Sequence, residues 1–394
     1  MDRRKKVDSK NTDHAVSSTT PAPRYIYLVA GELSGDAHGA SLMRALKTKV
    51  EDLEFCGAGG PEMQSLACGP FLEWTRHAVV GLWEVVKNYG YFRREFHRMI
   101  REISDIQPLA VILIDYPGFN LRLAKALRDK IPHLKIIYYI SPQVWAWNRG
   151  RIPKMARWLD LMICLFPFEK DLYEKSGLRT EFVGHPMLDE LEKKRLPQED
   201  RDLSCIGFFP GSREREVRKI LPVMLEAGML FREKLPDTRF VIPAASEKLY
   251  SLIQEMIVHS PNTEVQLRNA YPLMQSCGAG LVASGTATLE AAFFGLPYAL
   301  IYKVSPLTYA IGRRLIQVPF LGMVNILAGR EVVPEFVQEK ADPAHICLTL
   351  ESLLTDNERR EKLKLDLQHV IGTLGERGAA QRAASAIMQV LDLR

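Results

Sequence analysis

The sequence predicts an α/β protein built from two doubly wound domains, whose parallel sheets face each other across a cleft. Three observations support this fold class. The chain has 394 residues, which is long for one ordinary domain and sufficient for two separate cores. Strand-like and helix-like segments alternate along it, as βα units do. Runs such as "LAVILI" and "KIIYYI" are apolar throughout, which is typical of parallel strands covered by helices on both faces.

Strand-like runs set the order of the elements. We expect strands near residues 25–30, 53–57, 109–114, 135–140, 160–165 and 180–183 in the first half, and near 204–209, 238–243, 263–267, 279–283 and 297–302 in the second. Helix-like segments separate these runs, so right-handed crossovers are expected to join the parallel strands. Two helix-like segments, 356–371 and 376–391, end the chain.

A polar segment at 191–202, which contains Pro197, divides the chain nearly in half. We therefore expect one domain over 25–195 and a second over 196–372. A C-terminal helix within 373–394 could pack back on the first domain. Residues 1–24 are polar and lack the apolar stretch of a signal peptide, so we expect a flexible tail there. Its basic residues could touch anionic lipid, although a solvated tail is favoured.

Composition narrows the classes of function. The apolar content of 47% and the charged content of 25% are ordinary for a soluble globular protein, and the net charge of +5 does not favour nucleic-acid binding. No apolar run approaches the ~20 residues that a membrane-spanning helix needs. The six cysteines form no C-x-x-C pair, so we expect buried thiols in a reducing, cytoplasmic compartment. No motif has metal-ligand spacing, and we expect neither a metal ion nor a cofactor.

The stretch "FFPGSREREV", residues 208–217, follows an expected strand and precedes an expected helix. Gly211 and Ser212 free backbone N–H groups at the helix N-terminus, and Arg213 adds a cation beside them. Together they form a candidate anion site. A turn glycine, an N-cap serine and a solvated arginine explain the same residues equally well.

The stretch "VASGTATLEAAFFGLP", residues 282–297, repeats the pattern. Ser284, Gly285 and Thr286 begin a helix, whose dipole and free N–H groups favour a diphosphate. Glu290, one turn further on, could accept hydrogen bonds from ribose hydroxyls, or could merely complement the helix dipole. Because no Walker loop is present, the two turns indicate a nucleoside diphosphate ligand rather than ATP hydrolysis.

In the first half, "VILIDYPGFNLRLAKAL" delivers Asp115 to the carboxyl end of a buried strand, and Asn120 opens the next helix. Partial burial would raise the pKa of Asp115 and suit it to act as a general base for an acceptor hydroxyl. A capping or turn carboxylate is an equally good interpretation.

A second strand-end loop follows in "YYISPQVWAWNRGRIPKMARWLD", which carries Ser141, Gln143, Trp145 and Trp147. Its tryptophans could form a platform for a sugar or face a membrane. They could equally be packing residues, because tryptophan is usually mostly buried.

The segment 79–103 combines apolar and basic residues. Val79, Val80, Leu82 and Trp83 come first, and a helical pattern follows in which Arg93 and Arg94 lie between Phe92 and Phe96. A basic amphipathic helix of this kind can lie on an anionic membrane surface. The alternative is a helix with one core-facing side, and such stripes are more often core.

These motifs together resemble one family closely, the lipid-A-disaccharide synthases. The matching strings run in family order from about residue 25 to 338: "GELSGDAHGA", "GAGGPEMQ", "VGLWEV", "IDYPGFNLRLA", "YYISPQVWAWNRGR", "LFPFEKDLY", "FVGHPM", "PGSREREV", "ASGTATLE" and "NILAGREVVPEFVQ". The resemblance implies two Rossmann-like domains of the GT-B type and an inverting glycosyltransferase.

The resemblance also implies the substrates. The donor would be UDP-2,3-diacylglucosamine, the acceptor 2,3-diacylglucosamine 1-phosphate (lipid X), and the products a β(1→6) disaccharide lipid and UDP. Such an enzyme would be cytoplasmic, attached peripherally to the inner membrane, and could form a homodimer. Exchange of a C-terminal helical segment is one route to such a dimer.

Site residues follow from the matched motifs. Asp115 would be the catalytic base and Arg213 would stabilise the leaving diphosphate. The expected donor contacts are Gly211, Ser212, Arg213, Ser284, Gly285, Thr286, Glu290 and Asn325. The expected acceptor contacts are Glu32, Ser34, Asp36, Asn120, Ser141, Gln143 and Trp145. The expected membrane contacts are Val79, Val80, Leu82, Trp83, Arg93 and Arg94.

The turn "VAGELSGDAHGA" contributes the first three of those acceptor contacts. Glu32 and Asp36 could accept hydrogen bonds from sugar hydroxyls because the second domain would hold the donor phosphates. A structural role for Asp36 at a helix N-terminus is the alternative.

Two other functions fit the same residues. One is a different UDP-sugar transferase or an epimerase of the same fold, and the other is a peripheral protein that binds UDP-sugars without catalysis. Release of UDP from donor and acceptor would separate them.

Overall fold

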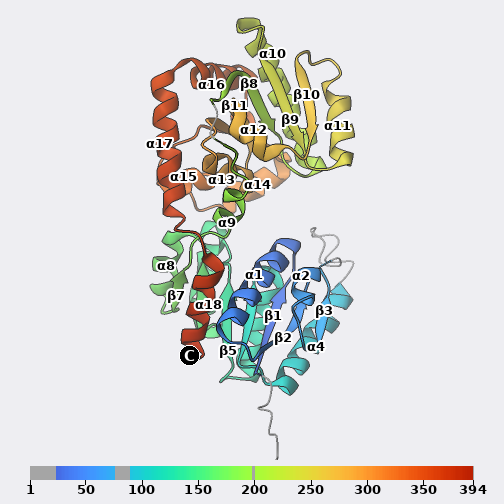
Figure 1. Ribbon diagram of the computed structural model, residues 1–394, viewed down its shortest axis with the longest axis vertical. Coiled ribbons are helices and arrows are strands. Elements are labelled where there is room, and N and C mark those ends of the chain that lie inside the picture. Colours follow the sequence, from blue (N-terminus) through green and yellow to red (C-terminus); the bar gives the residue numbers. More distant parts are fainter. Residues whose placement is uncertain (1–23, 76–88, 198–199, 394) are drawn as a thin grey trace, which may run out of the picture.

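Two lobes, each built on a parallel sheet, lie one above the other along the long axis of the molecule (Figure 1). The computed structural model describes residues 24–75, 89–197 and 200–393. Within them, the N-terminal lobe has a seven-stranded sheet of order β3-β2-β1-β4-β5-β6-β7, and the C-terminal lobe has a six-stranded sheet of order β10-β9-β8-β11-β12-β13. Both orders reverse direction beside the first strand, at β1 and β4 and at β8 and β11. This is the doubly wound arrangement that the sequence predicts.

Every strand expected from the sequence is present. The strands of the N-terminal lobe are β1 (Arg24–Ala30), β2 (Leu53–Gly59), β3 (Phe71–Glu73), β4 (Ala110–Ile114), β5 (Lys135–Tyr139), β6 (Leu161–Cys164) and β7 (Thr180–Phe182). Those of the C-terminal lobe are β8 (Asp202–Phe209), β9 (Arg239–Ala244), β10 (Thr263–Leu267), β11 (Cys277–Ala283), β12 (Tyr298–Tyr302) and β13 (Glu335–Val337). Only β3 and β13 were not expected, and both are three-residue strands at an edge of their sheet.

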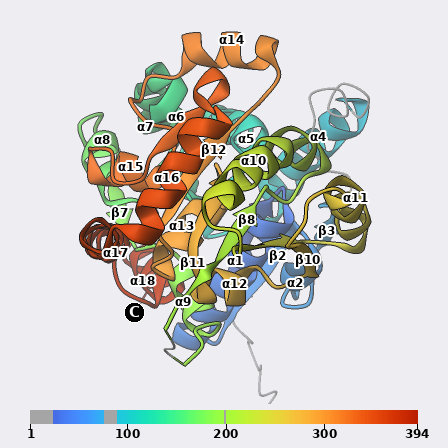
Figure 2. The ribbon, with the colours of Figure 1, turned by 90° about the horizontal axis from the view of Figure 1, so that it is seen from above.

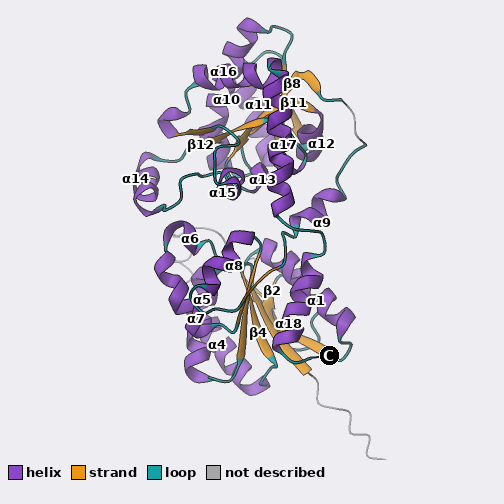
Figure 3. Cartoon of the chain, turned by 90° about the vertical axis from the view of Figure 1, so that its left-hand side faces the viewer, coloured by secondary structure: helices purple, strands orange, loops and turns teal. Residues whose placement is uncertain are grey.

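Helices cover both faces of the N-terminal sheet, as its apolar strands require (Figure 3). The helices of this lobe are α1 (Leu33–Lys49), α2 (Pro61–Gln64), α4 (Tyr89–Ile106), α5 (Pro117–Lys130), α6 (Val144–Trp147), α7 (Ile152–Trp158), α8 (Pro167–Glu174) and α9 (Met187–Glu192). Alternate residues of β1 point to opposite faces of the sheet, and each face has its own hydrophobic core. Ile26 and Leu28 pack in the core on the side of α1. Tyr27 and Val29 pack in the core on the side of α4 and α5.

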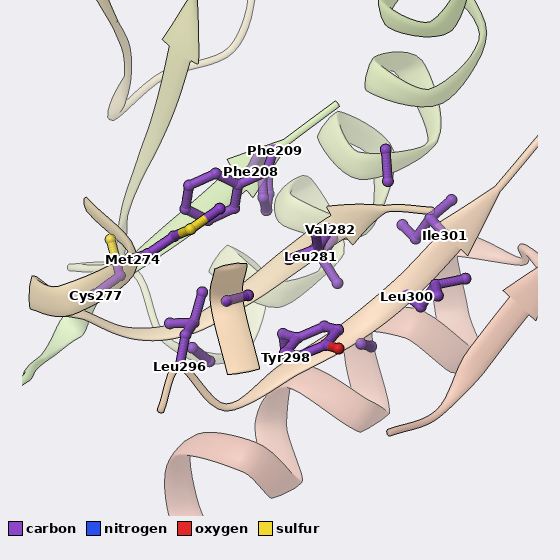
Figure 4. Packing of buried hydrophobic residues seen from close by; sticks show 14 of the residues in the cluster. Phe208, Phe209, Met274, Cys277, Leu281, Val282, Leu296, Tyr298, Leu300 and Ile301 are labelled. Atoms are coloured by element: carbon purple, nitrogen blue, oxygen red, sulfur yellow. The ribbon is translucent and has the colours of Figure 1, made fainter. Parts of the chain in front are cut away.

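The helices of the C-terminal lobe surround a single large core. They are α10 (Glu214–Lys234), α11 (Glu247–Ile257), α12 (Ala270–Ser276), α13 (Thr286–Phe293), α14 (Pro306–Leu315), α15 (Met323–Ala328), α16 (Pro343–Thr355) and α17 (Asn357–Thr373). Figure 4 shows part of this core, where Leu281 and Val282 of β11 lie among side chains from β8 and β12. The long helices α10 and α16 lie side by side above it (Figure 2).

The last helix, α18 (Ala379–Val390), returns to the N-terminal lobe (Figure 1). It packs against α1, and its Ala383 and Ile387 belong to the same core as β1. Arg382 donates a hydrogen bond from Nε to the carbonyl oxygen of Val183 at 2.8 Å. The C-terminal end of the chain is therefore part of the N-terminal lobe.

The polar segment between the lobes is anchored at its end. The guanidinium group of Arg201 donates hydrogen bonds to the carbonyl oxygens of Met274, Cys277 and Phe294. These contacts explain why β8 begins at Asp202, earlier than the apolar pattern alone indicates.

Some of the expected membrane contacts lie outside the described residues, namely Val79, Val80, Leu82 and Trp83. Nearly all of the N-terminal tail lies outside them as well. Among the described helices, none is both long and apolar enough to cross a bilayer.

Cys68 is exposed whereas the other five cysteines are buried, so the expectation of six buried thiols is wrong at that position.

Candidate active site

A cavity of about 450 Å³ opens in the C-terminal lobe, at the carboxyl ends of β8, β9 and β11. It brings together most of the residues expected to contact the donor: Gly211, Ser212, Arg213, Ser284, Gly285, Thr286 and Glu290. Its size is that of an ordinary small-ligand pocket, and its position at the point where the strand order reverses is where doubly wound sheets bind ligands.

The turn from β8 to α10 forms one wall of this cavity. Gly211 has a φ of +109°, a conformation that other residues rarely adopt, and a Cβ atom there would also lie 2.5 Å from a carboxylate oxygen of Glu216. Glu216 accepts a hydrogen bond from the Arg213 backbone N–H at 3.3 Å and pairs with the Arg213 guanidinium at 3.2 Å. The Arg213 side chain is nonetheless 70% exposed. The turn thus presents an oriented cation to the cavity.

The turn from β11 to α13 forms the opposite wall. Gly285 has a φ of +147°, a conformation that other residues rarely adopt. No side chain caps α13, so the N–H groups at the start of this helix can donate hydrogen bonds to an anionic ligand. Ser284 is half-buried and Thr286 is exposed at the same point.

Glu290 lies deeper in the cavity. Burial raises its pKa, and a hydrogen bond from the Tyr271 hydroxyl at 3.2 Å partly offsets this effect. Burial, together with the nearby Glu290 charge, raises the pKa of Tyr271 to about 12, so this phenol stays protonated and donates. Glu290 keeps a second oxygen that can accept a hydrogen bond from a ligand hydroxyl.

Besides Glu216, two polar residues of this cavity were not expected as donor contacts from the sequence. Arg268 follows β10 directly and is exposed, and Tyr271 lies at the start of α12. Because both come just after the carboxyl end of a parallel strand, the rule that identified Asp115 and Ser284 could have found them.

Asn325 does not reach the cavity, so its expected contact with the donor is wrong. This side chain is fully buried. Its amide nitrogen donates to the Val333 carbonyl and to Glu335, and its oxygen accepts from the N–H groups of Val332 and Val333. All its hydrogen-bonding capacity is therefore used to hold the loop before β13.

In the N-terminal lobe, Asp115 lies at the end of β4 in a strained backbone. Its φ is +46° and that of Tyr116 is +49°, two successive left-handed residues that are not glycine. The Asp115 N–H donates to Tyr139 at 3.0 Å, and its carbonyl accepts from the Tyr138 hydroxyl at 2.6 Å and from the Asn120 amide at 2.8 Å. The backbone that carries this carboxylate is therefore tightly fixed.

The electrostatic environment of Asp115 suits proton transfer. Burial is the main cause that raises its pKa to about 6, the negative charge of Glu32 adds to it, and a hydrogen bond from the Tyr116 backbone opposes it. A carboxylate with a pKa near 6 is ionised at neutral pH and still basic enough to accept a proton.

Asp36 and Asn120 are structural, which corrects their expected role in acceptor binding. Asp36 is 2% exposed and accepts hydrogen bonds from the backbone N–H groups of Gly60, Glu62 and Met63, so it caps α2. Asn120 is fully buried and donates to the carbonyls of Ile114 and Asp115, which positions the end of β4.

Trp145 is also structural rather than an acceptor contact. It is 3% exposed, and its indole N–H donates to Glu169 at 2.8 Å. Burial raises the pKa of Glu169 to about 7, although hydrogen bonds oppose the shift. In the loop that carries Trp145, Ser141 is buried and Gln143 is exposed. At the start of α1, the N-cap residue Glu32 is half-buried and Ser34 is exposed. Glu32, Ser34 and Gln143 thus stay accessible.

The carboxyl ends of the two sheets face each other. Gln317, which follows α14, donates its backbone N–H to the carbonyl of Ala146 on α6 at 2.8 Å. Both segments follow carboxyl ends of strands, in different lobes. The charge of Glu190 on α9 acts on His38 of α1 and on Glu290 of α13. Asp115 and the cavity therefore lie on the edges of the two lobes that are turned toward each other.

Among the residues that the structure describes, no group of three or more His, Cys, Asp or Glu side chains is placed to hold a metal ion.

Comparison with known proteins yields a family and a fold. A sequence model of the lipid-A-disaccharide synthetase family matches residues 26–390. The lipid-A-disaccharide synthase of Geobacter metallireducens is 39% identical over 381 residues, which cover 95% of this chain and 98% of that protein. The UDP complex of S. aureus MnaA has a TM-score of 0.63 at 13% identity, over 94% of this chain and 98% of that one. The calicheamicin glycosyltransferase CalG4 gives 0.57 at 13% identity, over 94% and 98%.

Proposed function

Because this chain belongs to the lipid-A-disaccharide synthase family, we propose that it condenses UDP-2,3-diacylglucosamine with 2,3-diacylglucosamine 1-phosphate. The products are a β(1→6) disaccharide 1-phosphate and UDP. Membership of this family favours a disaccharide-forming glycosyltransferase over an epimerase and over a binding protein without catalysis.

The observation that carries this proposal is the C-terminal cavity. Two glycine turns, an exposed arginine and a half-buried glutamate converge on a space of about 450 Å³. We assign the diphosphate to the uncapped start of α13 and to the Ser212 and Arg213 turn, because N–H groups and a guanidinium stabilise negative charge. Glu290 then binds the ribose hydroxyls, with Tyr271 holding its other oxygen.

In the mechanism we propose, Asp115 removes the proton from the 6-hydroxyl of the acceptor. That oxygen attacks the anomeric carbon of the donor from the face opposite UDP, and the configuration inverts. Negative charge develops on the departing UDP, where Arg213 and the start of α13 stabilise it. Glu32, Ser34 and Gln143 are the accessible groups left to orient the acceptor sugar.

The acyl chains of these substrates imply that the protein works at a membrane surface. We propose peripheral attachment at the cytoplasmic face of the inner membrane. Arg93 and Arg94 are exposed on α4, where they can contact anionic lipid. The buried side of α4 holds Met99 and Ile103 in the core, so the helix lies on the lobe and does not leave it to insert.

The Asp115→Asn variant tests the chemistry. We expect turnover, measured as UDP release from donor and acceptor, to fall about 10²–10⁴-fold because the base is lost. UDP affinity measured by calorimetry should not change, since the nucleotide binds the other lobe. Asp105→Asn, an exposed aspartate of α4, is the matched control with full activity. Near-normal turnover in Asp115→Asn would remove Asp115 as the base.

The pH profile tests the same assignment. The base acts when ionised, so kcat/KM should rise with pH up to the pKa of about 6 and level off above it. Below that pH it should fall about tenfold per pH unit. Glu32→Gln removes a charge that raises this pKa, so it should move the acid limb to lower pH. An acid limb that Glu32→Gln leaves in place would contradict the assignment.

A further inference from the structure

The N-terminal lobe contains a second cavity of about 450 Å³, between α4 and the start of α5. Four aromatic side chains line most of it: Phe92, Phe96, Tyr116 and Phe119. Figure 3 places α4 and α5 on the same side of the N-terminal sheet. None of the residues around this cavity contributes to the donor cavity.

The wall of this cavity is rigid. Trp74 lies behind it, fully buried, with its indole N–H bonded to the Ala30 carbonyl. Its ring makes edge contacts with Phe92, Tyr116 and Phe119 at centroid distances of 5.9, 6.1 and 4.8 Å. A preformed apolar cavity of this kind favours an apolar ligand, because no aromatic side chain has to be ordered on binding.

The cavity adjoins the proposed catalytic base. Tyr116, one of its walls, directly follows Asp115. The ring of Tyr116 also packs on Gly31, where a Cβ atom would lie 2.3 Å from it. The absence of a side chain at Gly31 thus lets this ring lie between the turn that carries Glu32 and the cavity. For a substrate whose sugar lies at Asp115, this cavity is therefore an adjoining apolar space.

The mouth of the cavity is positively charged. Arg93 and Arg122 line it and are exposed. Neither forms a salt bridge with any described residue. An apolar interior with two available guanidinium groups at its mouth is complementary to an amphiphile that has a hydrocarbon chain and an anionic head.

We propose that this cavity binds one acyl chain of the acceptor lipid, and that Arg93 and Arg122 bind the phosphate of the same molecule. The inference rests on the proposed function, which supplies an acylated, phosphorylated acceptor. The acceptor is chosen over the donor because the cavity lies beside Asp115, whereas the nucleotide cavity belongs to the other lobe. The acceptor is also chosen over a bulk phospholipid, because Tyr116 of the aromatic wall directly follows Asp115 in the proposed catalytic turn.

The test compares acceptors that differ by two methylenes in their acyl chains, presented in mixed micelles. Each buried methylene contributes about fourfold in kcat/KM, so the wild-type enzyme should prefer the longer acceptor about 15-fold. Phe96→Trp fills part of the cavity and should reduce this preference to about twofold or less. Phe182→Trp, at a half-buried phenylalanine of β7 outside the cavity, is the matched control and should keep the preference. Thermal melts and UDP calorimetry verify that both variants are folded.

The charged mouth is tested separately. Combined Arg93→Gln and Arg122→Gln should raise the KM for the phosphorylated acceptor about tenfold, but not that for an acceptor without phosphate. Arg101→Gln, on the exposed side of the same helix, should change either KM less than twofold.

The outcomes separate the two proposals. A wild-type protein that binds UDP but transfers sugar to neither acceptor overturns the proposed function and this inference with it. An active enzyme whose Phe96→Trp variant keeps the wild-type chain preference overturns the acyl site alone. If that variant instead binds phosphatidylglycerol vesicles more weakly while its chain preference is unchanged, the cavity serves bulk lipid and the inference is wrong.

Discussion

The turn after β4 and the turn after β11 both follow the carboxyl end of a central parallel strand, but their polar residues have different partners. In the N-terminal lobe, the Asn120 side chain donates to the carbonyls of Ile114 and Asp115, and Asp115 carries the carboxylate that we propose as the base. In the C-terminal lobe, Thr286 is exposed at the start of an uncapped helix and Glu290 keeps one oxygen for a ligand.

The first turn therefore positions one catalytic group, whereas the second turn recognises a ligand. The first turn holds one desolvated carboxylate in a fixed, strained backbone, which suits a single proton transfer at a defined point. The second offers several N–H groups and side chains to a ligand that is larger and highly charged. Each lobe thus presents the kind of turn that its proposed task requires.

Replacing Asp36 gives the largest expected effect on stability. Asp36→Ala leaves the buried N–H groups of Gly60 and Met63 and the part-buried N–H group of Glu62 without an acceptor, and each buried group costs about 1–3 kcal/mol. We expect a loss of about 3–5 kcal/mol in the free energy of unfolding of the N-terminal lobe, measured by chemical denaturation. Glu32→Ala, in the same turn but half-exposed, should change it by less than about 0.5 kcal/mol. Equal losses for the two variants would break the distinction between structural and accessible carboxylates.

Replacing Arg213 should have a smaller effect, and on binding rather than on stability. Charge-assisted hydrogen bonds contribute about 1.5–3 kcal/mol, and the exposure of Arg213 places it at the low end. Arg213→Ala should therefore weaken UDP binding about tenfold by calorimetry. Arg218→Ala removes an arginine of the same helix that is paired with Glu214 and should leave the affinity unchanged. Unchanged affinity in Arg213→Ala would refute its assignment to the diphosphate.

The sequence predicted the fold and the strand-end turns because both depend on local patterns. Continuous apolar runs identify central strands, and a glycine or an acidic residue directly after a run identifies a turn. The edge strands β3 and β13 were not predicted because a three-residue segment is too short to show a recognisable hydrophobic pattern. These strands form because their backbone pairs with a neighbouring strand, β2 for β3 and β12 for β13.

The roles of individual polar residues were harder to predict. Asp36 and Glu32 lie in one turn, yet only the structure shows that Asp36 is directed to α2, some 24 residues further along the chain. Asn325 lies in a motif that matches the family, but its partners are backbone groups of the next loop and the Glu335 carboxylate. Which polar groups are already satisfied depends on contacts between distant segments, and a single sequence does not contain that information.

Amide hydrogen exchange with and without UDP tests the division between the lobes most directly. The account predicts that UDP protects the backbone amides of residues 211–213 and 285–287, at the two turns of the C-terminal cavity. Protection of residues 115–119 without any at those C-terminal turns would contradict it, because the nucleotide would then be bound by the lobe to which we assign the acceptor.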